Sequence, residues 1–234
     1  MYLQIVSWKE GWQTMSPPGQ QSDIVLVARS KEALEATKAE IEVSAAGIRV
    51  HLIPCDLGDI DHLPTVCKEI LSIADSATHS QYVLIHNAGT MNTFDKPFEA
   101  FSDPKEIQDY FAINYTSMAV LTAQFLSAIA SSHQCWVVNI TSLLATAYIP
   151  GFSLYTPAKA ARNAYMGVLT AEKPNIRTLN YSPGPCLTNM LASIPKELTD
   201  KFDDKITCQE SITKFVCILK EDHFENGALI DFYD

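Results

Sequence analysis

The sequence of 234 residues predicts an α/β fold with a doubly wound parallel sheet. From residue 23 onward, short runs rich in β-branched residues alternate with longer segments of helical periodicity, which is typical of βαβ units. Several runs, such as YVLI and WVVNI, are apolar on both faces, as expected for strands that helices cover on both sides. Small and polar residues follow the runs, at the edge of the sheet where such folds bind their ligands.

We expect strands over residues 23–28, 48–54, 81–86, 135–140, 175–181 and 228–232. We expect helices over residues 31–46, 61–74, 105–131, 155–172 and 208–220. Residues 187–206 are predicted to form a mobile flap over the ligand-binding edge. No repeat, low-complexity tract or linker interrupts this order, so one domain is expected over residues 1–234.

The composition is that of an ordinary globular protein, with 47% hydrophobic and 19% charged residues. The formal net charge of -10 argues against a nucleic-acid partner, because nucleic-acid-binding proteins present a basic face. The N-terminus has no basic start followed by an apolar stretch, and no run reaches the ~18 apolar residues of a membrane span. We therefore expect a cytoplasmic protein that binds neither nucleic acid nor membranes.

The cysteines and histidines show neither metal-ligand nor disulfide spacing. The cysteines include no C-x-x-C pair and lie mostly in apolar runs, which indicates buried free thiols in a reducing compartment. They are Cys55, Cys67, Cys135, Cys186, Cys208 and Cys217. The histidines include no H-E-x-x-H pattern, so no metal site is predicted.

Tyr155 and Lys159 form a candidate catalytic pair. They are four residues apart in a helical pattern, so both side chains project from one face of the helix. An ammonium beside a phenol favours the phenolate and would bring the phenol pKa from about 10 toward the working pH, as a general acid requires. Ser142 lies 13 residues upstream at a strand end, where its hydroxyl could hold a substrate carbonyl oxygen. Asn114 could bind a water that links Lys159 to solvent.

The Tyr-x-x-x-Lys spacing alone is a weak signal, because many solvated helix faces produce it by chance. Its context is more specific. The serine lies at the end of the preceding strand, an Asn-Ala-Gly sequence follows the strand 81–86, and Pro-Gly follows the strand 175–181. These features, in this order and on these elements, predict the site of a carbonyl reductase.

With these motifs the chain resembles the short-chain dehydrogenase/reductase family, and within it the sepiapterin reductases. The resemblance runs from about residue 16 to residue 234 and leaves residues 1–15 as a divergent segment. It rests on VVNITSL, on the Tyr155 to Lys159 pair followed by AARNAY, on NIRTLNYSPGP and on the ending GALIDFYD. It implies a Rossmann-like fold, the cofactor NADP(H), and reduction of pterin side-chain ketones in tetrahydrobiopterin biosynthesis. It also implies a homodimer that the helices 105–131 and 155–172 would form.

The resemblance assigns roles to residues at the strand ends. The implied catalytic residues are Ser142, Tyr155 as the proton donor, and Lys159, beside the candidate Asn114. The implied cofactor-binding residues are Arg29, Ser30, Asp56, Leu57, Asn87, Ala88, Gly89, Tyr155, Lys159, Cys186, Leu187, Thr188, Asn189, Met190 and Leu191. The implied substrate-binding residues are Ser142, Leu143, Tyr155, Gly184 and Asp231.

Two of these assignments also have a physical reason. An acidic residue after the second strand binds the ribose 2′-hydroxyl of NAD, whereas an arginine accommodates the 2′-phosphate of NADP, so Arg29 favours NADP. A carboxylate such as Asp231 can accept paired hydrogen bonds from the guanidine-like edge of a pterin. The alternatives are a solvated loop cation for Arg29 and a surface carboxylate for Asp231.

One motif of the family is missing. The family opens with a strand that ends in T-G-x-x-x-G-x-G, whose glycines let the backbone approach the cofactor pyrophosphate. Residues 1–22 contain only Gly11 and Gly19, and Pro17 and Pro18 preclude a continuous helix there. Without a first strand, two apolar strand edges in the middle of the sheet would be unpaired. We expect YLQIVSW, residues 2–8, to fill part of this slot, because it is rich in strand-forming residues.

The sequence departs from the family pattern at two further positions, and it leaves two alternative functions open. His86 replaces the Asn common before Asn-Ala-Gly, and Pro157 must lie in the first turn of its helix to be tolerated. A non-catalytic or cofactor-deficient variant could retain the fold and dimerise with a full-length partner, because backbone contacts to the diphosphate carry much of the affinity for dinucleotides. A general ketone reductase without a pterin role would use the same catalytic residues.

Overall fold

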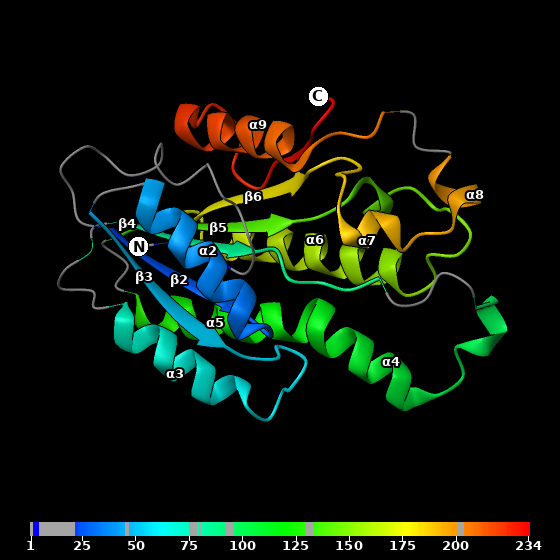
Figure 1. Cartoon of the computed structure of the whole chain (residues 1–234), viewed down its shortest axis with the longest axis horizontal. Coiled ribbons are helices and arrows are strands. Elements are labelled where there is room, and N and C mark those ends of the chain that lie inside the picture. Colours follow the sequence, from blue (N-terminus) through cyan, green and yellow to red (C-terminus); the bar gives the residue numbers. More distant parts are fainter. Residues whose placement is uncertain are drawn as a thin grey trace.

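The structure, a computed structural model, describes residues 2–4, 22–44, 47–74, 79, 81–91, 96–129, 133–200 and 204–234. Its strands form one seven-stranded sheet in the order β3-β2-β1-β4-β5-β6-β7, and every described pairing is parallel. Helices lie on both sides of this sheet, so the predicted doubly wound α/β fold is confirmed (Figure 1). The strand order reverses between β1 and β4, where such folds bind ligands.

The elements lie close to their predicted positions. The strands are β1 Tyr2–Gln4, β2 Ser22–Ala28, β3 Ile48–Pro54, β4 Gln81–His86, β5 Gln134–Ile140, β6 Arg177–Ser182 and β7 Leu229–Asp231. The longer helices are α2 Lys31–Ser44, α3 Leu63–Ile73, α4 Pro104–Phe111, α5 Ser117–Ala128, α6 Tyr155–Glu172 and α9 Cys208–Glu221. Short helical segments are η1 Phe98–Ala100, η2 Ala112–Thr116, η3 Leu143–Ala145, α7 Asn189–Ala192 and α8 Lys196–Thr199. Among the described helices, none combines the length and apolar character needed to cross a membrane.

The expected occupant of the central slot is confirmed for Tyr2–Gln4. This three-residue strand runs parallel to β2 on one side and to β4 on the other, and Leu3 lies beside Val25 and Leu84. The remainder of the predicted strand, residues 5–8, and the connection that carries the prolines lie outside the described residues. The described residues of this strand therefore join the two parts of the sheet.

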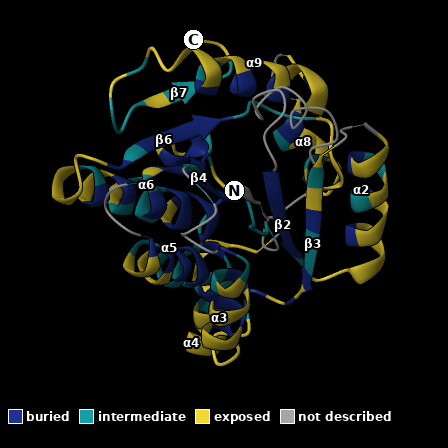
Figure 2. Ribbon diagram, turned by 90° about the vertical axis from the view of Figure 1, so that its left-hand side faces the viewer, coloured by how far each residue is buried: buried dark blue, intermediate teal, exposed yellow. Residues whose placement is uncertain are grey.

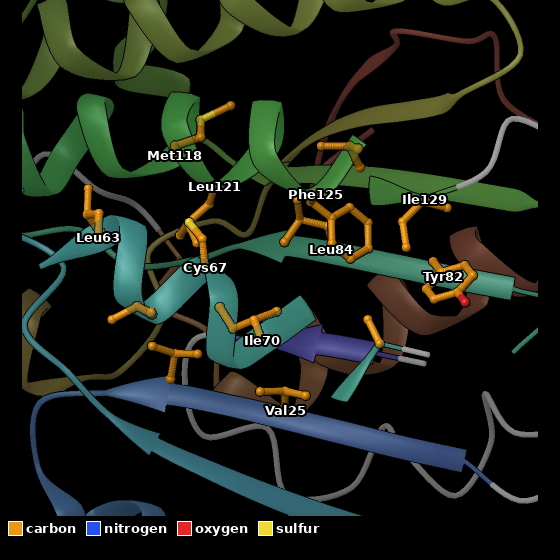
Figure 3. Packing of buried hydrophobic residues seen from close by; sticks show 14 of the residues in the cluster. Val25, Leu63, Cys67, Ile70, Tyr82, Leu84, Met118, Leu121, Phe125 and Ile129 are labelled. Carbon is orange, nitrogen blue, oxygen red and sulfur yellow. The ribbon is translucent and has the colours of Figure 1, made fainter. Parts of the chain in front are cut away.

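Side chains alternate between the two faces of each strand, and this alternation produces two separate cores. On one face, Val25 and Leu84 pack with Phe125 of α5 and with residues of α3 and α6 (Figure 3). On the other face, the residues that precede them in the strands, Ile24 and Val83, pack with α2 and α9. Figure 2 shows the consequence: the strands are largely buried, and the helices are exposed on their outer sides.

The helix predicted over residues 105–131 is not a single α-helix. A π-helical segment, Ala112–Thr116, lies between α4 and α5. Such segments widen one helical turn and are frequent at functional sites. This one carries Asn114, one of the predicted catalytic residues. The prediction missed the widened turn because the apolar periodicity on either side of it is still that of a helix.

The cysteines are free, as predicted, but they are not all buried. Cys55, Cys67 and Cys135 lie in the core, and Cys186 is partly buried. Cys208 and Cys217 are exposed, which corrects the prediction of buried thiols. Both belong to α9, and neither is on the face of that helix that packs against the sheet.

Candidate active site

The ends of β5 and the start of α6 bring the predicted catalytic residues together. Ser142 follows β5 and caps the short η3 segment, while α6 begins at Tyr155. Pro157 is the third residue of α6 and lies in its first turn, as predicted, where a backbone N–H has no intrahelical acceptor. Lys159 lies one turn further along, and both it and Tyr155 belong to the buried side of the helix.

Ser142, Tyr155 and Lys159 form one group. The hydroxyl of Ser142 lies near the Tyr155 phenol and favours its deprotonated form. The Nζ of Lys159 lies 5.6 Å from the centre of the Tyr155 ring and donates a hydrogen bond of 2.7 Å to the carbonyl of Ile140. Tyr155 is 9% exposed and Lys159 is 6% exposed. The three side chains therefore converge at the carboxyl edge of the sheet, and neither the phenol nor the amine points into bulk water.

Burial dominates the protonation of this pair. It raises the pKa of the Tyr155 phenol, and the hydrogen bond from Ser142 and the positive charge of Arg162 offset only part of that increase. Burial also lowers the pKa of Lys159 well below its usual value, and repulsion from Arg162 lowers it further. The expected lowering of the phenol pKa by Lys159 is therefore wrong for the protein alone, because desolvation of the phenolate outweighs charge attraction.

Asn114 connects the π-helical segment to the loop after β4. Its Oδ1 accepts a hydrogen bond of 2.9 Å from the Thr90 N–H, and its Nδ2 donates one of 3.0 Å to the Tyr110 carbonyl. A Cβ on Gly89 would lie only 3.0 Å from this Oδ1, so the Asn87-Ala88-Gly89 loop needs glycine to approach so closely. Both the oxygen and the nitrogen of the Asn114 side-chain amide thus form hydrogen bonds within the protein. The water expected between Asn114 and Lys159 stays a prediction.

The residues predicted to bind the adenosine end of a cofactor follow β2 and β3. Arg29 and Ser30 are exposed after β2, and the Ser30 Oγ accepts a hydrogen bond of 3.1 Å from the Ala33 N–H at the start of α2. Asp56 is exposed and Leu57 is buried after β3. These residues share the sheet edge with Tyr155 but lie on the other side of β1 and β4.

The segment predicted as a flap starts after β6. Leu187 donates a backbone hydrogen bond of 2.8 Å to the Ile206 carbonyl, which closes the neck of the segment. Thr188 caps α7. This helix contains Asn189, Met190 and Leu191, which belong to the predicted nicotinamide site. Cys186, at the neck, is partly buried. The segment thus contains ordered helical turns, and its mobility stays a prediction.

The remaining predicted substrate residues lie around this neck. Gly184 has a φ of +75°, which favours glycine, and a Cβ there would lie 3.1 Å from the side chain of Ile206. Asp231 ends β7 beside Ser182 of β6 and is partly buried. Leu143 is 58% exposed directly after Ser142. An exposed apolar side chain and a partly buried carboxylate therefore lie at the same edge of the sheet as the catalytic group.

Sequence reasoning did not assign a role to Arg162, which lies at the centre of the site. Its guanidinium is 1% exposed and reaches four oxygen atoms on β4, the loop after β4, η2 and β5. A signal was present: Arg162 follows Lys159 by three residues and Tyr155 by seven, which places all three on one face of α6. Because this face of α6 is buried, a cation on it must find buried hydrogen-bond acceptors.

A family profile described as short chain dehydrogenase matches residues 19–199. The sepiapterin reductase of Bos taurus is 35% identical over 233 residues, which cover 94% of this chain and 86% of that protein. The chain belongs to the short-chain dehydrogenase family. The sepiapterin reductase of Meriones unguiculatus is also 35% identical to this short-chain dehydrogenase, over 226 residues that cover 91% and 86% of the two chains. A solved 7 alpha-hydroxysteroid dehydrogenase complexed with NADH and 7-oxo glycochenodeoxycholic acid has a TM-score of 0.76 at 18% identity, over 98% of this chain and 91% of that one.

These relatives confirm the resemblance predicted from the catalytic motifs. The short-chain dehydrogenase is an oxidoreductase, and its family uses a nicotinamide cofactor and a small-molecule substrate. The sepiapterin reductases match nearly the whole chain, so the similarity is not confined to the cofactor-binding half of the fold.

Proposed function

We propose that this short-chain dehydrogenase is an NADPH-dependent carbonyl reductase that reduces side-chain ketones of a pterin, the reaction type of tetrahydrobiopterin biosynthesis. The observation that carries the proposal is the group of Ser142, Tyr155 and Lys159, in which the phenol and the amine are buried. The relatives named sepiapterin reductase support the substrate class. Asp231 would accept hydrogen bonds from the guanidine-like edge of the pterin.

The side chains of the site divide the chemistry between them. NADPH, when bound, supplies a hydride to the carbonyl carbon. Ser142 donates a hydrogen bond to the carbonyl oxygen, and Tyr155 transfers its phenolic proton to that oxygen. Because burial raises its pKa, Tyr155 holds its proton until the developing alkoxide takes it. In its protonated form Lys159, whose Nζ lies 5.6 Å from the ring centre, stabilises the phenolate that remains.

The residues at the sheet edge fit such a cofactor at both ends. Arg29 follows β2 and Ser142 follows β5, and three strand spacings of ~4.8 Å place these ends about 14 Å apart, a span that suits an extended dinucleotide. Arg29 is exposed and available for a 2′-phosphate, which supports NADPH over NADH. Gly89 has no side chain, so the cofactor could approach the backbone after β4 closely. Lys159 would hold the nicotinamide ribose.

The first experiment measures NADPH oxidation at 340 nm by the purified chain with sepiapterin as substrate. We expect turnover, and we expect Tyr155→Phe to reduce kcat by about 10²- to 10⁴-fold, because the proton donor is lost. Tyr148→Phe is the matched control, since Tyr148 is 86% exposed. Equal turnover by the Tyr155→Phe variant and the wild-type chain would contradict the proposed mechanism.

One observation favours a second candidate, a cofactor-deficient variant that retains the fold. The sequence contains no T-G-x-x-x-G-x-G, the motif that brings backbone N–H groups to the cofactor pyrophosphate. A titration with NADPH, followed by fluorescence, separates the two functions. Saturable micromolar binding supports the reductase, and no binding supports the variant.

We further propose a cytoplasmic homodimer formed through α4, α5 and α6. The support is the apolar content of these helices, which includes Val168 of α6 at 57% exposure. Light scattering during size-exclusion chromatography tests the assembly. Replacing Val168 by glutamate should shift a dimer toward monomer.

A further inference from the structure

The guanidinium of Arg162 is a buried hub between four parts of the site. Its Nε donates to Asn139 Oδ1 at 2.7 Å, and its Nη2 donates to the His86 carbonyl at 2.5 Å. Its Nη1 donates to the carbonyls of Ala88 at 2.9 Å and Asn114 at 3.3 Å. A single side chain thus fixes β5, the end of β4, the Asn-Ala-Gly loop and the π-helical segment relative to α6.

All four acceptors are neutral. Within the described part of the chain, no carboxylate forms an ion pair with Arg162. Burial lowers the pKa of Arg162 to about 10, so the group keeps its charge at neutral pH. A buried cation without a counter-ion is costly, and such groups are concentrated at functional sites. The site therefore holds a positive charge that no described side chain neutralises.

The titratable groups around Arg162 identify the anion that this charge would meet. His86 of β4 faces it, and burial followed by repulsion from Arg162 lowers the pKa of that imidazole well below its usual value, so it is neutral. Burial raises the pKa of Tyr110 of α4. Tyr155 and Lys159 lie on the same buried face of α6 as Arg162, about two turns and one turn before it. Burial raises the pKa of Tyr155 and lowers that of Lys159, and the charge of Arg162 opposes the first shift and adds to the second. The phenolate of Tyr155 is the negative charge that proton donation itself creates here.

We propose that Arg162 is a positioning residue of this site, whose guanidinium holds the strand ends around Tyr155 and stabilises the phenolate that forms when Tyr155 gives up its proton. The proposal rests on the reductase function. In the step, the O–H bond of Tyr155 breaks and the proton goes to the carbonyl oxygen, while the carbonyl carbon takes the hydride from NADPH. The phenolate that remains recovers a proton from solvent, which restores Tyr155 for the next turnover.

The positioning role has a consequence at one backbone amide. The Thr90 N–H donates to Asn114 Oδ1 at 2.9 Å, and Arg162 holds the Asn114 carbonyl. Removing the guanidinium leaves the Asn114 carbonyl without this donor and should weaken the neighbouring hydrogen bond to Thr90. The exchange rate of the Thr90 amide hydrogen therefore reports on position, independently of catalysis.

The test compares Arg162→Met, Arg162→Lys and the control Arg177→Met. Arg177 lies at the amino end of β6, away from the site, and its guanidinium also donates to a backbone carbonyl, that of Phe224. In reduction, kcat falls at high pH as Tyr155 loses its proton. We expect Arg162→Met to lower kcat at neutral pH by at least about tenfold and to move the alkaline limb of the pH profile upward, because the phenolate is less stable. Arg162→Lys, which keeps the charge, should restore the limb toward the wild-type position.

Each outcome decides the matter. A wild-type pH profile in Arg162→Met, or an Arg162→Lys profile no different from that of Arg162→Met, would overturn the electrostatic role. If the wild-type chain reduces nothing, the reductase function fails, and the positioning role is judged on the Thr90 amide alone. Faster exchange in Arg162→Met than in Arg177→Met supports it, and equal exchange overturns it. If Arg162→Met does not fold by circular dichroism, Arg162→Lys and Arg162→Gln carry the same comparison.

Discussion

Replacing Asp23 by asparagine should lower the free energy of unfolding by about 3 kcal/mol at neutral pH. The Asp23 side chain, at the amino end of β2, is only 2% exposed. Its Oδ1 accepts hydrogen bonds from Arg49 Nε at 2.9 Å and His51 Nε2 at 2.7 Å. Its Oδ2 accepts them from Arg49 Nη2 at 2.6 Å and His79 Nε2 at 2.8 Å. One carboxylate thus ties β2 to β3 and to His79, which lies two residues before β4.

The magnitude follows from these contacts. Asparagine keeps one oxygen, so two of the charge-assisted hydrogen bonds are lost, each worth about 1.5–3 kcal/mol, and an NH₂ group faces two donors. Arg49 is 54% exposed and regains water when released, which places the total near the lower end, about 3 kcal/mol. For a chain of this size, this corresponds to a decrease in Tm of about 6–12 °C.

The pH dependence has a defined sign. Burial alone would raise the pKa of Asp23, but hydrogen bonds from Arg49, His51 and His79 outweigh it and hold the pKa below its usual 3.8. The stabilisation is therefore complete above pH ~4 and is lost as the pH falls further, since protonation removes the charge. The difference between Asp23→Asn and the wild-type chain should shrink in acid.

Urea unfolding followed by tryptophan fluorescence, at pH 7, 5 and 3, measures this difference. Asp61→Asn is the control, because Asp61 is exposed. A difference below ~0.5 kcal/mol at pH 7, or one that stays constant down to pH 3, would refute the reasoning.

Three further changes test the site and the core. Gly89→Val should weaken NADPH binding in the fluorescence titration, because its Cβ would lie 3.0 Å from Asn114 Oδ1, whereas Gly167→Ala, with open space around it, should not. Phe125→Ala should lower the free energy of unfolding by about 3–5 kcal/mol in urea, since the ring is 2% exposed in the core. Asp231→Ala should raise KM for sepiapterin and leave the turnover of a small diketone unchanged; an equal loss for both substrates would argue against a pterin contact.

Much of the fold could be predicted because the two periodicities of the sequence differ clearly. β3 and β4 begin and end at the predicted residues, since turn-forming residues bound their apolar runs. The family resemblance implies a strand in the central slot, and the strand-forming residues 2–8 offered an occupant, which the structure confirms for Tyr2–Gln4. The π-helical segment was not predictable, because one widened turn leaves the apolar pattern on either side intact.

The candidate site was predictable where side-chain spacing determines it. Tyr155 and Lys159 share a helix face by their separation alone, and the serine follows a recognisable strand. Arg162 was missed because a charged residue on a helix ordinarily faces water. Three of its four acceptors are main-chain carbonyls, which no side-chain pattern encodes. Burial of the Tyr155 phenol likewise depends on tertiary packing, so the direction of its pKa shift was not available from the sequence.

The described residues of β1 join the two parts of the sheet, since they pair with β2 on one side and with β4 on the other. These three residues, at ~3.3 Å per residue, give about 10 Å of described strand between β2 and β4. A dinucleotide bound along the carboxyl edge of the sheet would contact both of these parts. Its binding would then raise the free energy of unfolding by about 2.7 kcal/mol at a ligand concentration 100 times Kd. The Tm of such a protein would therefore rise with the concentration of its cofactor.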